Sequence, residues 1–198
     1  MDRTFISSNL SNATSNLSTF DTATFGVRGP QGNQAVTLRS SSDLECQIKG
    51  TIDFIFGSAV AVFQNCTIMV KKCLPKQSNV ITAEGGKFDG NPTAFSFQFC
   101  NITADFDLLP SIKLFSTFLG RPWKPYSTTV FMESYIGNLL SPKGWLAWKA
   151  SENLDTLFYA EYKNFGPGGS TMDRVKWKGY HVLNYPRQAI NFTVSRLI

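Results

Sequence analysis

The sequence contains a single histidine, His181, among 198 residues. It also lacks the paired cysteines and histidines of a zinc site, the aspartate-rich loop of a calcium site, the glycine loop that cradles phosphate and the Gly-x-Ser-x-Gly turn of serine hydrolases. We therefore expect neither a metal nor an organic cofactor. An enzyme built from this chain would have to work with carboxylates, amides and arginine.

Long apolar runs and concentrated charge are absent as well. No stretch approaches the roughly 20 apolar residues of a membrane span. Charged residues make up 17% of the chain with a net charge of +5, and the basic residues are scattered rather than gathered into an arm. The sequence therefore predicts neither a membrane nor a nucleic-acid partner, whereas a basic surface suits an acidic polysaccharide.

Glycosylation sequons are abundant, and three of the six fall in the first 18 residues. The first residues lack the apolar segment of a signal peptide. Six sequons in a short chain nevertheless favour a secreted glycoprotein. The sequon asparagines are Asn9, Asn12, Asn16, Asn65, Asn101 and Asn191.

Short β-branched or aromatic segments, separated by Gly, Asn, Pro or Lys, predict an all-β chain. Two further segments, 107–113 and 153–161, are suited to a helical turn or two. The predicted strand segments are residues 35–39, 51–56, 60–63, 67–70, 80–83, 95–99 and 129–132.

One of these segments is repeated. Residues 63–68 (Phe-Gln-Asn-Cys-Thr-Ile) recur as residues 97–102 (Phe-Gln-Phe-Cys-Asn-Ile), at an offset of 34. Strand-like repetition predicts a solenoid in which like residues stack about 4.8 Å apart. This spacing suits a disulfide, so we predict a bond between Cys66 and Cys100, with two buried thiols as the alternative. Cys46 and the remaining cysteine would be left over.

Residues 50–57 (Gly-Thr-Ile-Asp-Phe-Ile-Phe-Gly) predict a buried strand between two glycine turns. Strict alternation would place Ile52 and Phe54 on one face and Asp53 on the other. A carboxylate on such a strand is desolvated unless it is paired or faces a cleft. Both interpretations, a structural salt bridge and a functional site, stay open at this point.

Arg121 and Trp123 stand two positions apart, so an extended backbone would point both side chains the same way. Arginine binds carboxylates and tryptophan stacks on pyranose rings, which together make a site for a sugar acid. The alternative is a surface arginine packed on a core tryptophan.

Six segments together resemble plant pectin methylesterases (pectinesterases), in family order and over nearly the whole chain. The resemblance implies a right-handed parallel β-helix with long loops that form a cleft. It also implies hydrolysis of the methyl esters of polygalacturonate, without a cofactor. The segments are residues 34–39, 50–57, 119–123, 144–148, 161–168 and 174–180.

The resemblance also implies individual roles. Asp53 matches the carboxylate nucleophile of the family, and the Cys66–Cys100 spacing resembles a disulfide of some members. The positions that match substrate-binding residues are Gln34, Phe56, Arg121, Trp123 and Trp148.

Further expectations concern the whole protein. We expect one domain over residues 1–198, incomplete at both ends and without the inhibitor-like pro-domain of some members. The resemblance implies a monomer secreted to the plant cell wall. Its expected partners are methylated homogalacturonan (pectin) and a proteinaceous pectinesterase inhibitor.

The chain departs from the family pattern just before residues 50–57. Family members carry there about one further coil with a Tyr-Gln-Asp-Thr-Leu segment, which supplies the general acid and an oxyanion glutamine. Here Leu44 runs directly into Glu45, and the partner expected for Cys46 is lost with the coil. Two alternatives to an active esterase follow: an inactive pectin-binding wall protein and an incomplete gene product.

Overall fold

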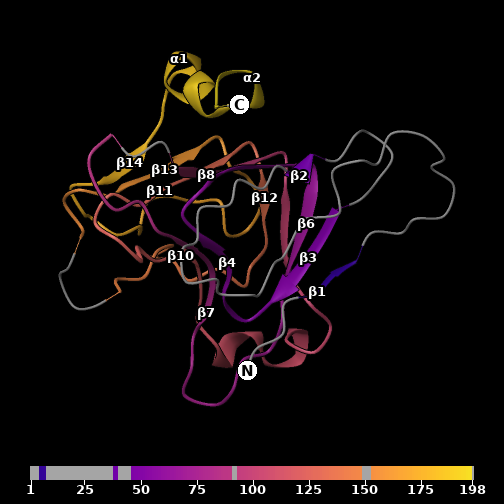
Figure 1. The fold of residues 1–198 in the computed structure, drawn as a ribbon. Helices are drawn as coiled ribbons and strands as arrows, with labels where there is room; N and C mark the ends of the chain where they lie inside the picture. The colour runs from indigo at the N-terminus through magenta and orange to yellow at the C-terminus, as the bar shows by residue number, and fades with distance from the viewer. Residues whose placement is uncertain (1–4, 8–37, 40–45, 91–92, 149–152, 198) are drawn as a thin grey trace, which may run out of the picture.

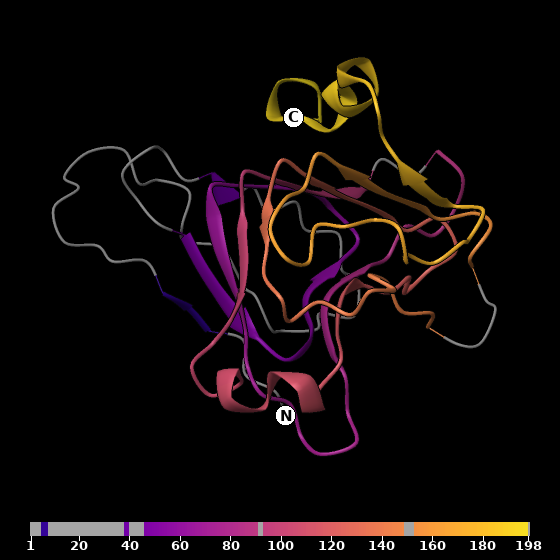
Figure 2. The ribbon, with the colours of Figure 1, turned by 180° about the vertical axis from the view of Figure 1, so that it is seen from behind.

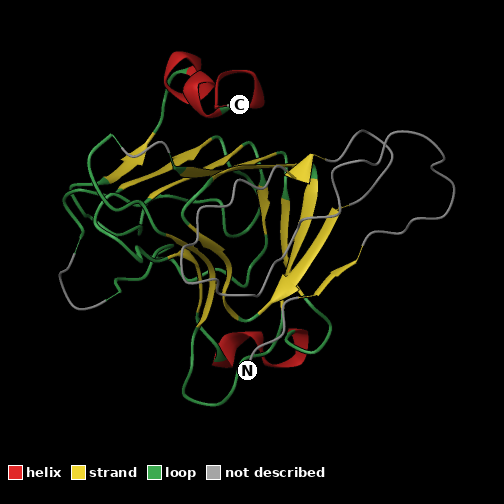
Figure 3. Cartoon of the chain, viewed as in Figure 1, coloured by secondary structure: helices red, strands yellow, loops and turns green. Residues whose placement is uncertain are grey.

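The computed structural model of the chain describes residues 5–7, 38–39, 46–90, 93–148 and 153–197. Within these residues, short strands wind as successive coils of a parallel β-helix, and the helical turns lie outside the coils (Figures 1 and 3). The predicted all-β parallel β-helix is therefore confirmed. In chain order the elements are β1 (Phe5–Ser7), β2 (Leu38–Arg39), β3 (Cys46–Gly50), β4 (Ile52–Gly57), β5 (Val60–Gln64), β6 (Cys66–Val70), β7 (Asn79–Glu84), β8 (Ala94–Gln98), β9 (Asn101–Ala104), η1 (Leu109–Leu114), β10 (Thr117–Gly120), β11 (Thr128–Met132), β12 (Tyr135–Ile136), β13 (Phe158–Tyr162), β14 (Tyr180–Val182), α1 (Pro186–Ala189), η2 (Ile190–Phe192) and α2 (Val194–Leu197).

Three sheets form the sides of the solenoid, in the orders β1-β3-β6-β9-β12, β10-β7-β4 and β14-β13-β11-β8-β5-β2. Neighbouring strands pair in parallel, as expected when each coil repeats the path of the previous one. The exception among the described strands is β1, which pairs antiparallel with β3. Figure 2 shows the six-stranded sheet from behind, with the C-terminal helices above it.

The repeat at an offset of 34 residues corresponds to one turn of the solenoid. Phe63 pairs in register with Phe97, and Phe97 with Phe131. Their rings stack inside the coils with centroids 4.5 and 4.3 Å apart. Trp145 packs against Phe131 and continues this aromatic stack toward the last coils. The stack thus places three phenylalanines at one interior position, since like residues fill like positions on each coil.

The sharp corner after the six-stranded sheet is made by one residue per coil. Asn65, Phe99, Glu133 and Lys163 all have a left-handed backbone, with φ of 56°, 55°, 49° and 48°. This conformation is rare outside glycine and asparagine. Its recurrence on four successive coils turns the chain by the same angle each time and keeps the following strands in register.

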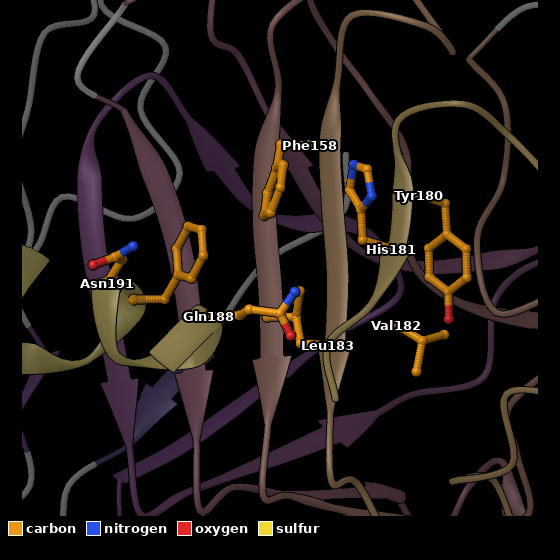
Figure 4. Close-up of a pocket in the computed structure, with 8 residues that line it drawn as sticks. Phe158, Tyr180, His181, Val182, Leu183, Gln188 and Asn191 are labelled. Carbon is orange, nitrogen blue, oxygen red and sulfur yellow. The ribbon is translucent and has the colours of Figure 1, made fainter. Parts of the chain in front are cut away.

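The C-terminal helical segment covers the outer face of the six-stranded sheet (Figure 1). The hydroxyl of Ser96 on β8 donates to the carbonyl of Phe192 at 2.6 Å. Beside this contact lies a hollow lined partly by Phe158, His181 and Phe192 (Figure 4). His181 stacks on Phe158 with centroids 4.8 Å apart, and burial lowers the pKa of its imidazole. His181 thus belongs to a different sheet from the predicted nucleophile Asp53.

The predicted disulfide is wrong for this structure, in which Cys66 and Cys100 are separate thiols. Both occupy the expected equivalent positions on successive coils, but each thiol donates to a main-chain carbonyl, Cys100 to that of Phe63 at 3.3 Å. Cys46 is also in register with Cys66, so Cys66 has a thiol on either side. A hydrogen bond with Cys100, together with burial, raises the pKa of Cys66 to about 12.

The predicted strand segments coincide with strands of the structure, namely β2, β4, β5, β6, β7, β8 and β11. Residues 35–37 of the first segment lie outside the described residues. Of the two predicted helical segments, residues 107–113 largely form the 3-10 helix η1. The other, residues 153–161, is wrong in its second half, because residues 158–161 belong to β13. Pairing with β11 decides the conformation of that segment, which local propensity does not capture.

Candidate active site

Asp53 lies on β4, at one edge of the three-stranded sheet. The pairing of β4 with β7 shifts register between Ile52 and Ile55, as in a β-bulge, and Asp53 has a left-handed backbone with φ of 50°. The predicted strict alternation is therefore corrected: Phe54 and Ile55 are 3% and 1% exposed, whereas Ile52 is only half-buried. Such a strained residue is often found where a side chain must be aimed for function.

The carboxylate of Asp53 is held by two nitrogens of Arg121. Nε donates to Oδ1 at 2.9 Å and to Oδ2 at 3.1 Å, and Nη2 donates to Oδ2 at 2.5 Å. The two side chains remain 20% and 25% exposed. The pair is thus fixed in the two-pronged geometry that arginine and carboxylate prefer, while solvent and a ligand can still reach it.

Aromatic side chains flank this pair. The guanidinium of Arg121 lies over the ring of Trp148, 4.4 Å from its centroid. Phe56, which follows Asp53 on β4, meets Trp123 edge to face with centroids 6.5 Å apart. The structure therefore brings the predicted arginine and aromatic residues together from β4 and from two loops distant in sequence.

The segment 121–128, which carries two of these residues, is fastened to the end of β7. The N–H of Arg121 donates to the carbonyl of Thr82 at 2.9 Å, and the N–H of Trp123 donates to the carbonyl of Glu84 at 3.1 Å. These bonds continue the parallel pairing of β10 with β7 beyond the strand itself. The orientation of Arg121 and Trp123 thus depends on β7.

The Glu84 side chain holds the far end of the same segment. It is fully buried, and its Oε2 accepts hydrogen bonds from the N–H groups of Gly86 at 3.0 Å and Thr128 at 2.7 Å. Oε1 has no hydrogen bond of ordinary length to the described residues, although the hydroxyls of Thr93 and Ser127 lie close enough to favour the charged form. Burial is the largest influence and raises the pKa of this carboxyl. No sequence pattern singled out Glu84, because a lone glutamate at a strand end carries no signature.

A second carboxylate–arginine pair, Glu161 and Arg174, lies in the last coils. Its members are 1% and 3% exposed, and Nε of Arg174 donates to Oε1 of Glu161 at 2.7 Å. Trp145 Nε1 and the hydroxyl of Tyr180 donate to the same oxygen. This pair is enclosed by its own partners, unlike the pair at Asp53.

Several expectations lie beyond the described part of the chain or receive no support from it. Gln34, the predicted substrate-binding glutamine, falls outside the described residues. In the described residues β4 is the edge strand of its sheet, and no second carboxyl group bonds to Asp53 or Arg121. The position where the family places its acid-bearing coil is thus not filled by a described strand.

The described part of the chain lacks two other functional features. No group of three His, Cys, Asp or Glu side chains among the described residues is arranged to hold a metal ion. None of the described helices has the length and apolar character needed to span a membrane.

Comparisons with known proteins identify the family of the chain. The family model described as Pectinesterase matches residues 44–198. A probable pectinesterase/pectinesterase inhibitor 32 of Arabidopsis thaliana is 47% identical over 91% of this chain and 42% of its own length. Pectinesterase/pectinesterase inhibitor PPE8B of Prunus persica is 45% identical over the whole chain and 46% of its own length. The chain thus spans less than half the length of these relatives.

The similarity to the peach protein extends over 239 positions, against 198 residues in this chain. Segments inside the matched region of that protein are therefore lacking here. Among solved structures, the carrot pectin methylesterase has a TM-score of 0.77 at 44% identity, covering 78% of this chain and 48% of that one. An Aspergillus niger pectin methylesterase has a TM-score of 0.59 at 27% identity, covering 71% and 42%.

Proposed function

The chain belongs to the pectinesterase family, and we propose that it hydrolyses the methyl esters of polygalacturonate with Asp53 as the nucleophile. The observation that carries this proposal is the geometry of Asp53. It is a partly exposed carboxylate on a strained residue, fixed by two nitrogens of Arg121. We further propose that the protein acts in the plant cell wall, where this polymer occurs.

The proposed reaction begins when a carboxylate oxygen of Asp53 attacks the carbonyl carbon of a methyl ester. The tetrahedral intermediate collapses, the bond to the methoxy group breaks, and methanol leaves with one proton taken from water or a nearby acid. An anhydride between Asp53 and the galacturonate remains. Water then attacks the galacturonate carbonyl, which regenerates the Asp53 carboxylate and leaves a free uronic acid.

The substrate chain would lie over the aromatic side chains beside the pair. Trp123, Phe56 and Trp148 offer apolar surface for pyranose rings. The net charge of +5 suits a polymer that gains one carboxylate with each ester removed. Because curated relatives carry both pectinesterase and pectinesterase inhibitor in their names, an inhibitor protein is proposed as a second partner.

A second candidate function is pectin binding without turnover. It is favoured by the edge position of β4, since the described residues place no second carboxyl beside Asp53 to protonate methanol and activate water. Loss of such a group typically costs about 10²–10⁴ in rate. The Asp53–Arg121 pair and its aromatic neighbours would still hold the polymer.

The test is methanol release from highly methylated pectin by the purified full chain, with Asp53→Ala as the matched variant. Release by the wild type that the variant loses supports the proposed esterase. Binding of methylated oligogalacturonate with no release above the variant supports the binding protein instead. A wild type that neither unfolds cooperatively nor binds the polymer contradicts both and indicates an incomplete gene product.

A further inference from the structure

The outer face of the five-stranded sheet carries a row of exposed aromatic residues that the proposed function does not use. Tyr135 on β12 is 37% exposed and Phe165, in the loop after β13, is 57% exposed. The two are paired in register by a parallel bridge, and their rings meet at 5.7 Å between centroids. Exposed aromatic pairs on a sheet face are unusual and commonly mark a surface that something covers.

The residue next in this row is a sequon asparagine. Asn101 on β9 is exposed and pairs in register with Tyr135 on β12. Side chains in register on neighbouring strands lie about 4.8 Å apart and share a face. Asn101, Tyr135 and Phe165 thus form a line across three successive coils.

The orientation of the strand displays the whole sequon on the same face. Asn101 and Thr103 alternate with Ile102, which is completely buried in the core. The asparagine amide and the threonine hydroxyl therefore both face outward. Neither atom makes a hydrogen bond to the described residues, so no structural bond has to break for the amide to be modified.

We propose that Asn101 carries an N-linked glycan whose first sugar rings lie on Tyr135 and Phe165. In its formation Nδ2 of Asn101 bonds to C1 of N-acetylglucosamine, a lipid-linked oligosaccharide diphosphate supplies the sugar, and the lipid diphosphate leaves while the amide loses a proton. The first sugar extends away from the asparagine and reaches the neighbouring ring one strand away. The apolar face of a pyranose stacks on an aromatic ring, and this contact removes the exposed rings from water.

This proposal is independent of ester hydrolysis, because the row lies on a different sheet from Asp53. The first experiment is site-specific glycan mapping of the full chain secreted from a plant host. Peptide N-glycosidase in ¹⁸O-labelled water releases the glycan and converts each glycosylated asparagine to labelled aspartate, and the peptide that contains position 101 is then analysed by mass spectrometry. Labelled aspartate at position 101 is expected, and it should vanish in Asn101→Gln but persist in the matched variant Asn65→Gln. An unlabelled Asn101 in secreted wild-type protein would overturn the proposal.

The second experiment tests whether the glycan on Asn101 stacks on the aromatic rings, in addition to being attached. The melting temperature is measured before and after enzymatic deglycosylation, for the wild type and for Tyr135→Ala. We expect deglycosylation to lower the melting temperature of the wild type by roughly 2–4 °C, and that of Tyr135→Ala by less than half as much. Phe88→Ala, which removes an exposed ring in the loop after β7 and away from the five-stranded sheet, should keep the wild-type difference. Equal differences in wild type and Tyr135→Ala would refute stacking of the glycan on this row.

Discussion

Two carboxylate–arginine pairs in this molecule have the same chemistry and opposite surroundings. Glu161 and Arg174 are sealed in the last coils, where indole, phenol and amide donors share the carboxylate. Asp53 lies on an edge strand and Arg121 in the loop after β10, and their side chains are 20% and 25% exposed. Among the described residues, the side-chain hydrogen bonds of both residues join them to each other alone, and Trp148 stacks on the guanidinium.

This difference fits a structural role for the buried pair and the proposed catalytic role for the open pair. A buried pair must make all its hydrogen bonds within the protein. A buried donor or acceptor without a partner costs free energy, because water cannot reach it to form the missing hydrogen bond. A pair that is left partly open, on a strained backbone, keeps a nucleophile available to a substrate. Sequence spacing does not distinguish the buried pair from the open pair. The exposure of the side chains and the number of their hydrogen-bond partners do.

The largest expected effect is loss of catalysis on removing the nucleophile. Asp53→Asn keeps the shape of the side chain and one acceptor oxygen for Arg121 but cannot form the anhydride. We expect methanol release to fall by about 10³-fold or more. The melting temperature should stay within roughly 2 °C of the wild type, because the pair is partly exposed. A large loss of stability with activity retained would reverse the roles assigned to the two pairs.

The opposite result is expected at the buried pair. Arg174→Met leaves Glu161 as an uncompensated buried charge, which typically costs about 3–5 kcal/mol. Thermal unfolding should show a melting temperature lower by roughly 10 °C. Methanol release per folded molecule, measured well below that temperature, should be unchanged. The double variant Arg174→Met with Glu161→Leu serves as the control and should recover much of the loss.

The buried carboxyl of Glu84 should make the stability of the protein depend on pH. Burial raises the pKa of its carboxyl in the folded protein above the ordinary value of 4.5. The folded state therefore holds the proton more tightly than the unfolded state, and this contribution to stability is present below pH 4.5 and lost as the pH rises through the folded value. Glu84→Gln cannot ionise, yet its carbonyl can still accept from Gly86 and Thr128.

Thermal unfolding at a series of pH values checks this expectation. The variant should equal the wild type near pH 4 and melt about 2–4 °C higher near pH 7. A variant that is less stable than the wild type at neutral pH would show that the Glu84 charge is needed.

The smallest effect concerns the aromatic residue over the exposed pair. Trp148→Ala removes the ring that lies 4.4 Å from the Arg121 guanidinium. Covering about 20–40 Å² of this ring with a pyranose would contribute about 0.5–1 kcal/mol, so oligogalacturonate affinity should weaken by roughly 2–5-fold. Titration followed by intrinsic fluorescence measures this affinity, and Trp177→Phe serves as the control change of a tryptophan. No weakening would mean that Trp148 lies away from the bound polymer.

The sequence predicted the solenoid because its chemistry repeats with the coil. Phe63 and Phe97 match at an offset of 34 since both fill the same interior position, and their register confirms it. Local alternation failed at Asp53 because a bulge, set by pairing with β7, moved Ile55 into the core.

The candidate active site was harder to predict than the fold from residue patterns alone. Asp53 and Arg121 are 68 residues apart, so no local pattern pairs them, and the family resemblance singled out each residue separately. The contribution of Glu84 depends on burial and on two main-chain donors, neither of which leaves a mark in the sequence. Equal spacing of Cys66 and Cys100 gave their positions correctly but not their oxidation state.

The most direct test of the central claim is detection of the covalent intermediate on Asp53. The full chain is mixed with methylated oligogalacturonate, quenched with hydroxylamine within milliseconds, digested and analysed by mass spectrometry. Because the described residues offer no second carboxyl to speed hydrolysis, the anhydride should accumulate, and the peptide containing Asp53 should carry a hydroxamate at that residue. Methanol release by the wild type with no modification of Asp53, at any time after mixing, would contradict the assignment of Asp53 as the nucleophile.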